Sequence, residues 1–223
     1  MSKMLSGPHR EPASGHAPTS LVVFLHGVGA NGADLIDLAD SLATVLPDAA
    51  FVAPNAPDPC AMNGMYEWFS LMDRRPAPML AGVQTAAPIL TDFLRLELEA
   101  RRLPYSRLAL VGFSQGTMMA LHVAPRLPAP VAAVVGFSGH LLAPERLAEE
   151  TRSRPPVLLV HGEADPVVPF DSLESAAQGL RAARLPVETL ARPGLGHGID
   201  GPGLFAAARF LLRHLNTALP ANG

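Results

Sequence analysis

Short apolar runs rich in Val, Leu and Phe alternate along the chain with longer segments in which apolar residues recur at helical spacing. Such runs are typical of buried parallel strands, and the longer segments are typical of helices with one buried face. Strands are predicted at Leu21–Leu25, Phe51–Ala53, Leu108–Val111, Val131–Phe137, Val157–Val160 and Val187–Ala191. Helices are predicted at Asp34–Leu46, residues 79–102 with a kink or break at Pro88, residues 115–124, Pro144–Glu150, Ser172–Arg184 and Gly203–Leu215. This alternation predicts an α/β protein with a mostly parallel central sheet and helices on both faces.

The chain has no internal repeat and no shift in composition that would mark a domain boundary. Residues 1–20 are polar and rich in Pro, Gly and His, which predicts a loose arm or one short edge strand. Residues 21–219 are then expected to form a single domain, because 223 residues with 48% hydrophobic content suffice for one sizeable core.

Residues 54–78 are the longest stretch without strand or helix periodicity. They carry the only tryptophan, Trp68, together with Tyr66, Met65 and Met72. Loops longer than about 12–15 residues are usually functional or disordered, and aromatic and methionine content of this kind argues against disorder. We therefore expect the loop to fold over a cleft as a minimal lid, with its thioethers facing apolar ligands.

Composition narrows the classes of function. A formal net charge of -3 gives no electrostatic case for binding nucleic acid or an anionic membrane. No apolar run is long enough for stable membrane insertion. The single cysteine, Cys60, excludes an intramolecular disulfide and a multi-cysteine metal site, and it fits a reducing compartment. Because residues 1–20 contain no apolar signal core, a cytoplasmic protein is expected.

The segment with the clearest chemistry joins the apolar run at Leu108 to a Gly-x-Ser-x-Gly pentapeptide, Gly112–Gly116, and then to a helix-forming segment. This is the layout of a nucleophile elbow, in which Ser114 sits on a sharp turn between a strand and a helix. Glycine is expected on either side of the serine, where a Cβ would crowd the backbone of so tight a turn. The alternative is a glycine-rich loop with an incidental serine, and the flanking strand and helix favour the nucleophile.

Candidates for a base and an acid follow two other predicted strands. Asp165 comes after the Val157 strand, and His197 comes after the Val187 strand in a loop rich in glycine. The carboxyl ends of parallel strands meet at one edge of a sheet, so these side chains are expected to gather there with Ser114. The chain order Ser, Asp, His is that of α/β-hydrolase triads, in which His accepts the serine proton and Asp orients the His.

Other acidic residues compete with Asp165 for this role. Glu163 and Asp171 lie near it in the sequence, but Asp165 lies one turn beyond the strand and next to rigidifying prolines. Asp200 is too close to His197 in the sequence to be a comfortable partner. Asp165 is therefore the predicted acid.

An oxyanion hole needs two N–H groups that converge where negative charge develops. Gln115 supplies the amide after the nucleophile, and Val28 supplies the second from the loop after the Leu21 strand. The same loop, residues 27–32, also matches the G-x-G-x-x-G outline of a dinucleotide site. That motif needs an acidic residue at the end of the next strand, where this chain has Pro54 and Asn55, so the oxyanion hole is favoured.

Together these motifs resemble those of the phospholipase/carboxylesterase family of small α/β-hydrolases, which includes the acyl-protein thioesterases. The motifs are Phe24–Gly29, Pro54–Pro57, Trp68–Phe69, Gly112–Gly116, His161–Pro169 and Gly196–His197, within a resemblance that extends from Leu21 to Leu215. The site residues that it implies are the triad Ser114, Asp165 and His197 and the oxyanion donors Val28 and Gln115. It also implies an α/β-hydrolase fold, no metal or organic cofactor, and a homodimer as a common assembly. One departure is Thr117, where the family usually has a second glycine.

We therefore expect a serine carboxylesterase that hydrolyses short-to-medium acyl carboxylic esters through an acyl-enzyme, with a small-molecule ester as its partner. An acyl-protein thioesterase or a lysophospholipase is the nearest alternative, since the same triad serves these acyl groups. A remote alternative is a non-catalytic, ligand-binding relative, which would have no need of all three triad residues. Trp68, Leu71, Met72 and Val168 are expected to contact the apolar part of the substrate.

Overall fold

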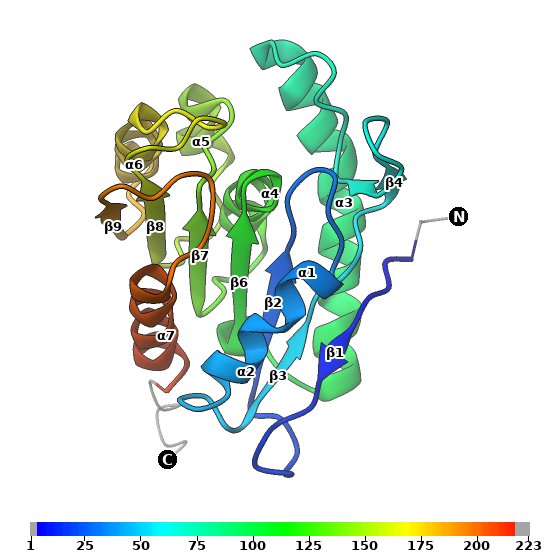
Figure 1. Ribbon diagram of the computed structural model, residues 1–223. Coiled ribbons are helices and arrows are strands. Elements are labelled where there is room, and N and C mark those ends of the chain that lie inside the picture. Colours follow the sequence, from blue (N-terminus) through cyan, green and yellow to red (C-terminus); the bar gives the residue numbers. More distant parts are fainter. Residues whose placement is uncertain (1–3, 217–223) are drawn as a thin grey trace.

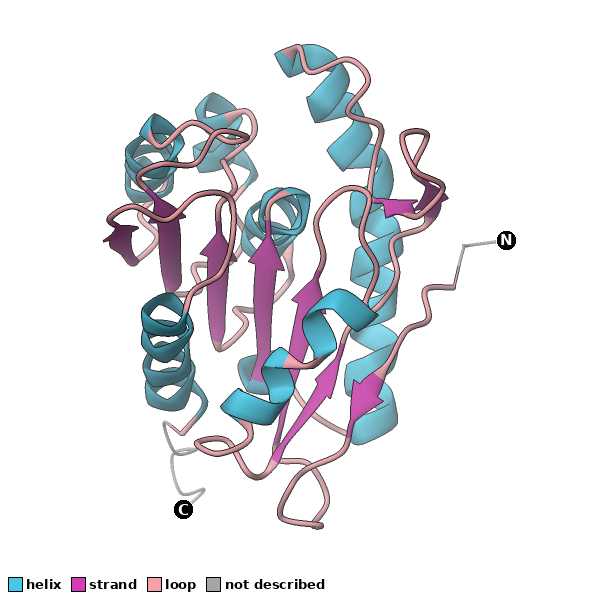
Figure 2. Cartoon of the chain, in the orientation of Figure 1, coloured by secondary structure: helices cyan, strands magenta, loops and turns pink. Residues whose placement is uncertain are grey.

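The computed structural model describes residues 4–216, and its main sheet has seven strands in the order β1-β3-β2-β6-β7-β8-β9 (Figure 1; Figure 2). The strands are β1 (His9–Arg10), β2 (Ser20–Leu25), β3 (Ala49–Val52), β6 (Leu108–Phe113), β7 (Ala133–Phe137), β8 (Val157–Gly162) and β9 (Val187–Arg192). Every neighbouring pair is parallel except β1 with β3, so the predicted mostly parallel sheet is confirmed. The N-terminal arm supplies the short edge strand β1, and the predicted domain limit at residue 219 lies outside the described residues.

Helices cover both faces of the sheet (Figure 1). One face carries α1 (Ala33–Ile36), α2 (Leu38–Leu42) and α7 (Gly201–Leu215), and the other carries α3 (Pro76–Arg101), α4 (Gln115–Val123), α5 (Pro144–Glu150) and α6 (Asp171–Ala182). Side chains alternate between the two cores: Val22 and Phe24 of β2 pack with α1, α2 and α7, whereas Leu21 and Val23 pack with α3 to α6. Burial on both faces explains why the strands are continuous apolar runs. None of the helices within residues 4–216 has both the length and the apolarity to cross a bilayer.

The predicted helix Asp34–Leu46 is two short helices, α1 and α2. The N–H of Asp40 donates to the carbonyl of Asp37, three residues back instead of four. Such a bond belongs to a tighter turn and interrupts the α-helical ladder. The apolar periodicity correctly predicts helix here, but it carries no information on the tighter turn that separates α1 from α2.

Helix α3 runs unbroken through Pro88, so the predicted local break is wrong. Proline removes one N–H donor from the helix interior, which ordinarily costs about 3 kcal/mol. Here Ala86 and Leu90, on either side of it, are 2% and 0% exposed, and they pack into the main core. Tertiary packing therefore holds the helix together where its own ladder is interrupted.

The loop at residues 54–78 folds back onto the domain. Its strands β4 (Asp58–Pro59) and β5 (Tyr66–Glu67) form a small antiparallel hairpin that an Ala30–Tyr66 bridge ties to the loop after β2. Directly after the hairpin, Trp68 and Phe69 are buried in the core, whereas Met72 is 74% exposed. Met72 therefore faces solvent and not a cleft, and a lid role for residues 54–78, called the lid loop below, remains a prediction.

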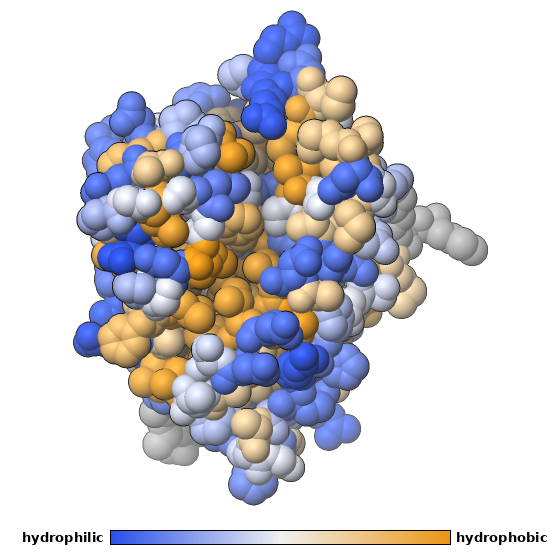
Figure 3. Space-filling view, viewed as in Figure 1, coloured by the Kyte–Doolittle hydropathy of each residue, from blue (hydrophilic) through white to orange (hydrophobic). Residues whose placement is uncertain are grey.

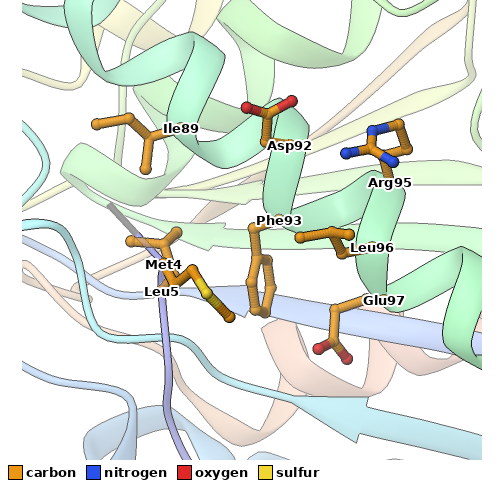
Figure 4. A pocket seen from close by; sticks show the side chains of 8 residues that line it. All are labelled: Met4, Leu5, Ile89, Asp92, Phe93, Arg95, Leu96 and Glu97. Carbon is orange, nitrogen blue, oxygen red and sulfur yellow. The ribbon is translucent and has the colours of Figure 1, made fainter. Parts of the chain in front are cut away.

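The described part of the N-terminal arm runs beside α3. A cavity of about 220 Å³ lies between them (Figure 4). Leu5 of the arm and Phe93 of α3 contribute to its lining, together with the charged side chains Asp92, Arg95 and Glu97. None of the predicted site residues lines this cavity, so the arm and the candidate chemistry belong to different parts of the molecule.

Thr117, at the position where the family usually has glycine, fills space left open by two glycines beneath the elbow. Its Oγ1 donates a hydrogen bond of 2.9 Å to the carbonyl of Phe137. A Cβ on Gly136 would lie 2.5 Å from Thr117 Cγ2, and a Cβ on Gly139 would lie 2.4 Å from Thr117 Cβ. The side chain at 117 is accommodated because positions 136 and 139 carry none.

We predict that Gly136→Ala lowers the free energy of unfolding by about 2 kcal/mol, because overpacking a filled site forces its neighbours to move. Thr117→Ser removes the obstructing methyl group and keeps the hydroxyl that bonds to Phe137, so it should recover most of this loss when combined with Gly136→Ala. Urea unfolding of the two single variants and the double variant measures the coupling. Additive effects would contradict the proposed contact.

Candidate active site

Ser114 occupies a strained turn between β6 and α4. Its backbone has φ 53° and ψ −114°, a conformation that a non-glycine residue adopts only where the surroundings enforce it. A Cβ on Gly112 would lie 2.5 Å from the backbone nitrogen of Thr117, and a Cβ on Gly116 would lie 1.9 Å from the carbonyl oxygen of Leu25. Both glycines are therefore sterically required, as the pentapeptide predicts.

The structure brings His197 and Asp165 together. His197 lies in the loop between β9 and α7, and its Nδ1 is 2.8 Å from Oδ2 of Asp165, which lies just beyond β8. The carboxylate can only accept, so Nδ1 carries the proton and Nε2 keeps its lone pair. That tautomer is the one a general base needs.

The Asp165 carboxylate is fully enclosed, with a side-chain exposure of 0%. Its Oδ1 accepts hydrogen bonds from the backbone N–H groups of Val167 and Val168, at 2.8 and 2.9 Å. Burial by itself raises the pKa of Asp165, but the hydrogen bonds from His197 and from the two N–H groups outweigh it, so the pKa lies below its ordinary value. Asp165 is therefore an anion that can stabilise an imidazolium.

His197 lies beside the elbow. Its ring centroid is 4.9 Å from that of Phe113, the residue before Ser114. The described residues include no hydrogen bond between Ser114 and His197, which is common in a free enzyme because catalytic hydrogen bonds often tighten only with substrate bound. The geometry therefore places a base of the correct tautomer next to a strained serine.

An ion pair holds the His197 loop at its two ends. Arg192, the last residue of β9, donates to Asp200 at 2.9 Å, and Asp200 also caps α7 by accepting from the N–H of Gly203. Asp200 is thus engaged away from His197. The other rival acids, Glu163 and Asp171, are exposed, so Asp165 is the acid that the structure pairs with the base.

Two backbone N–H groups near Ser114 have no acceptor among the residues that the structure describes. Within residues 4–216, neither the N–H of Val28 nor that of Gln115 donates to another residue. Gln115 directly follows Ser114 at the start of α4, and Val28 follows Gly27, where an added Cβ would lie 3.3 Å from Ser114 Cβ. Two unengaged donors close to a nucleophile suit the predicted oxyanion hole.

Trp68 belongs to a buried hydrogen-bond network and not to the surface of a substrate pocket, so its predicted role is corrected. It is 1% exposed, and its indole N–H donates to the carbonyl of His26 at 3.0 Å. The side-chain amide of Gln115 accepts a hydrogen bond from the backbone N–H of Trp68 at 2.9 Å and donates one to the carbonyl of Phe69 at 2.6 Å. The lid loop is thereby fastened to Gln115, the residue whose backbone N–H is the predicted oxyanion donor.

His26 completes this network as a structural residue. Its Nδ1 is 2.7 Å from the Gly27 carbonyl, which fixes the proton there, and its Nε2 accepts from the Ala56 N–H at 2.9 Å. Burial lowers the pKa of His26, which keeps the ring neutral and both contacts intact. Both ring nitrogens of His26 are therefore engaged in structural hydrogen bonds.

A cavity of about 400 Å³ lies beside Ser114 and contains residues that the sequence did not single out. Its lining consists of His26, Gly27, Ala30, Asp34, Leu35, Leu38, Phe113 and Ile199. Figure 3 shows apolar atoms gathered in the middle of this face, between the regions of α1 and α7. The sequence holds one indication of this cavity: Phe113 directly precedes Ser114, and Ile199 lies two residues after His197. Leu71, Met72 and Val168 do not line this cavity, and their contact with substrate remains a prediction.

The chain matches known proteins over nearly its whole length. Residues 12–215 match the phospholipase/carboxylesterase family profile. Esterase YpfH of Escherichia coli (strain K12) is 27% identical over 200 residues, which cover 90% of this chain and 83% of that protein. Acyl-protein thioesterase 1 of Mycosarcoma maydis is 32% identical over 179 residues, which cover 72% of this chain and 75% of that protein. Among solved structures, esterase PE8 has a TM-score of 0.91 and 45% identity, covering 95% of this chain and 100% of that one.

The strand order, the elbow and these matches define an α/β-hydrolase of the serine-hydrolase class. The chain belongs to the phospholipase/carboxylesterase family, which confirms the resemblance drawn from its motifs. Within the described residues, no group of three or more His, Cys, Asp or Glu side chains is placed to hold a metal ion.

We predict that Gln115→Glu destabilises the protein by about 3 kcal/mol, because a buried carboxylate cannot donate to the Phe69 carbonyl and would carry an unpaired charge. Esterase turnover should fall as well, since the variant loosens the residue whose N–H is the predicted oxyanion donor. Thermal and urea unfolding and ester hydrolysis measure the two effects.

Gln178→Glu is the matched control, because Gln178 is exposed on α6 and bonds only to Glu174. Placing a like charge there should change stability by less than about 0.5 kcal/mol. If Gln115→Glu changed stability as little as this control, the hydrogen bonds between Gln115 and the lid loop would not stabilise the protein as predicted.

Proposed function

We propose that this protein is a carboxylesterase that hydrolyses short-to-medium acyl esters through an acyl-enzyme formed on Ser114. The observation that carries the proposal is the pairing of His197 Nδ1 with the buried Asp165 carboxylate beside a strained serine. The 45% identical structural relative is an esterase, and so is one of the curated relatives. Each part of the arrangement has a separate task in the reaction.

In the first half-reaction, Ser114 Oγ attacks the ester carbonyl carbon while His197 Nε2 takes the hydroxyl proton. The carbonyl oxygen becomes an oxyanion that accepts hydrogen bonds from the Val28 and Gln115 N–H groups. The tetrahedral intermediate then collapses, the bond to the leaving oxygen breaks, and that oxygen takes the proton from His197. Asp165 stays ionised throughout and stabilises the imidazolium.

In the second half-reaction, a water molecule attacks the acyl-enzyme carbonyl and gives its proton to His197. Collapse of the second tetrahedral intermediate breaks the bond to Ser114 Oγ, which recovers its proton from His197. The products are a carboxylic acid and the alcohol released earlier. The chemistry balances with water alone, so the cycle uses no metal or organic cofactor.

The cavity of about 400 Å³ near Ser114 supports the proposed acyl substrate. Leu35, Leu38 and Ile199 give it an apolar lining suited to an alkyl chain. We propose that the acyl chain lies there.

Thioester hydrolysis is the second candidate function. The relative at 32% identity is an acyl-protein thioesterase, and a thiolate leaving group requires no change in the triad. We propose a cytoplasmic location, which the free and buried Cys60 supports because a reducing compartment keeps thiols unpaired. The homodimer that is common in the family remains a prediction.

Hydrolysis of p-nitrophenyl esters from acetate to palmitate tests the proposal. We expect the highest kcat/KM at short-to-medium acyl chains, and a loss of at least about a thousandfold in kcat for Ser114→Ala, because the nucleophile is removed. An acyl thioester assayed by thiol release, at matched acyl length, compares the second candidate. Unchanged turnover by Ser114→Ala would refute the mechanism, and a clear preference for the thioester would favour the second candidate.

The placement of the acyl chain predicts the effect of Leu38→Trp. The larger side chain should fill part of the cavity and lower kcat/KM for octanoate by about tenfold, while acetate is hydrolysed as before. Leu96→Trp is the control, because Leu96 is a partly exposed leucine in the distant cavity beside the N-terminal arm. An unchanged chain-length profile for Leu38→Trp would show that the acyl chain binds elsewhere.

A further inference from the structure

The loop that carries His197 has little packing of its own. It joins β9 to α7 over residues 193–200, and none of these residues is buried (Figure 1). Glycines lie on both sides of His197. A Cβ added to Gly196 would lie 3.9 Å from the carbonyl oxygen of Ala164, and one added to Gly198 would meet no described atom within 4 Å. The backbone freedom of glycine is therefore not restricted by neighbouring atoms here, and the loop needs other restraints to keep the base in one position.

Backbone hydrogen bonds restrain the loop on its β9 side. The N–H of Glu163 donates to the carbonyl of Arg192 at 3.0 Å, and the N–H of Ala164 donates to the carbonyl of Leu195 at 2.9 Å. Both bonds come before His197 in the chain. Within residues 4–216, Gly198 and Ile199 make no hydrogen bond, so the first polar restraint after His197 is Asp200.

Asp200 connects the far end of the loop to both elements that the loop joins. Its Oδ2 accepts a hydrogen bond of 2.9 Å from Nε of Arg192, the last residue of β9. Its Oδ1 accepts from the N–H of Gly203 at 2.8 Å and so caps α7. The absence of a side chain at 203 leaves room for this carboxylate, since a Cβ there would lie 2.8 Å from Oδ1. One carboxylate therefore closes the loop between the end of β9 and the start of α7.

A second ion pair between β9 and α7 provides a comparison. Glu188 of β9 and Arg213 of α7 are paired, and they lie farther along both elements from the ends of the loop. Their side chains are 57% and 54% exposed, whereas those of Arg192 and Asp200 are 21% and 24% exposed. A partly buried pair is screened by salt less than an exposed one. Of these two pairs, Arg192–Asp200 is the stronger restraint and the one that closes the loop.

We propose that Arg192 and Asp200 are a positioning pair that holds the His197 loop closed and so keeps the base in place beside Ser114. The inference rests on the proposed function, in which His197 is the base. Displacement of a catalytic group by about 1 Å can reduce the rate about a hundredfold, so a base on a glycine-rich loop depends on how firmly the loop is held. The pair acts through His197 and not by contact with the substrate.

Removal of the charge on either partner should lower turnover and leave KM nearly unchanged. Arg192→Met keeps a long side chain, and Asp200→Asn keeps an oxygen that can accept from the N–H of Gly203. Each should lower kcat for p-nitrophenyl acetate by about tenfold, with KM changed by less than about threefold. The acetate ester is chosen because its acyl group is too short to depend on Ile199 in the cavity wall. Both changes break the same contact, so the double variant should lose less than about twofold beyond either single one.

The glycine after His197 provides a readout that a purely structural role would not move. Gly198 has a φ outside the left-handed region and open space around it, so Gly198→Ala restricts the loop without a clash. Alone, it should change kcat by less than about twofold. Combined with Arg192→Met, it should raise kcat at least about threefold, because a stiffer backbone replaces part of the lost restraint. Gly201→Ala, in the first turn of α7 and outside the loop, should give no such recovery.

Arg213→Met is the matched control for the loss of an ion pair between β9 and α7, and it should leave kcat and KM within about twofold of the native values. Melting temperatures separate turnover from stability. Asp200→Ala also removes the cap of α7, so it should melt about 3 °C below Asp200→Asn while its kcat stays similar.

The proposal is overturned if Arg192→Met and Asp200→Asn hydrolyse the ester at the native rate, if Arg213→Met loses as much turnover as they do, or if Gly198→Ala recovers none of the loss. Ser114→Ala, assayed in the same series, distinguishes the two proposals. If it loses activity while the Arg192 and Asp200 variants keep the native kcat, the triad stands and the role of the pair does not. If Ser114→Ala retains full activity, the proposed function itself fails.

Discussion

A carboxylate removed entirely from water governs the arrangement of this site. Burying an unpaired anion would cost several kcal/mol, so Asp165 is tolerable only where N–H donors surround it. Two of those donors come from its own turn and one comes from the loop after β9. The demand of one buried charge therefore determines the path of the 165–168 turn and the position of the base. A site with a less buried acid would not constrain its neighbours in this way.

The nucleophile side of the site depends on backbone contact instead of charge. Ser114 keeps its strained φ because α4 approaches β2 so closely that no side chain fits at Gly116. Gln115, the first residue of α4, bonds through its side chain to the backbone N–H of Trp68 in the lid loop. The indole N–H of Trp68 in turn donates to the carbonyl of His26, at the start of the loop after β2. The lid loop and the predicted oxyanion donors beside Ser114 are thus linked through buried hydrogen bonds that join Gln115, Trp68 and His26.

Sequence patterns predicted the sheet, the helices on both faces and the Ser114, Asp165 and His197 set, since apolar periodicity and position after a strand are local properties. They missed what depends on tertiary packing. Trp68 has the composition of a pocket residue, but a hydrogen bond to His26 and the core around it decide its burial. The cavity lined by Leu35, Leu38 and Ile199 joins segments more than a hundred residues apart, and no local spacing encodes that meeting.

The side chain at Thr117 has a consequence for how relatives of this protein diverge. A threonine there is compatible with the fold because Gly136 and Gly139 leave it space, so the residue allowed at 117 depends on those at the other two positions. A lineage with glycine at 117 has room for a small side chain at 136, and a lineage with threonine does not, whereas a Cβ at 139 would in either case lie 2.8 Å from the carbonyl oxygen of Ser114. Exchange of the pentapeptide region between family members would then succeed or fail according to residues some twenty positions away. Aligned positions 117 and 136 should consequently vary together across the family, because their side chains compete for the same space, while position 139 stays glycine.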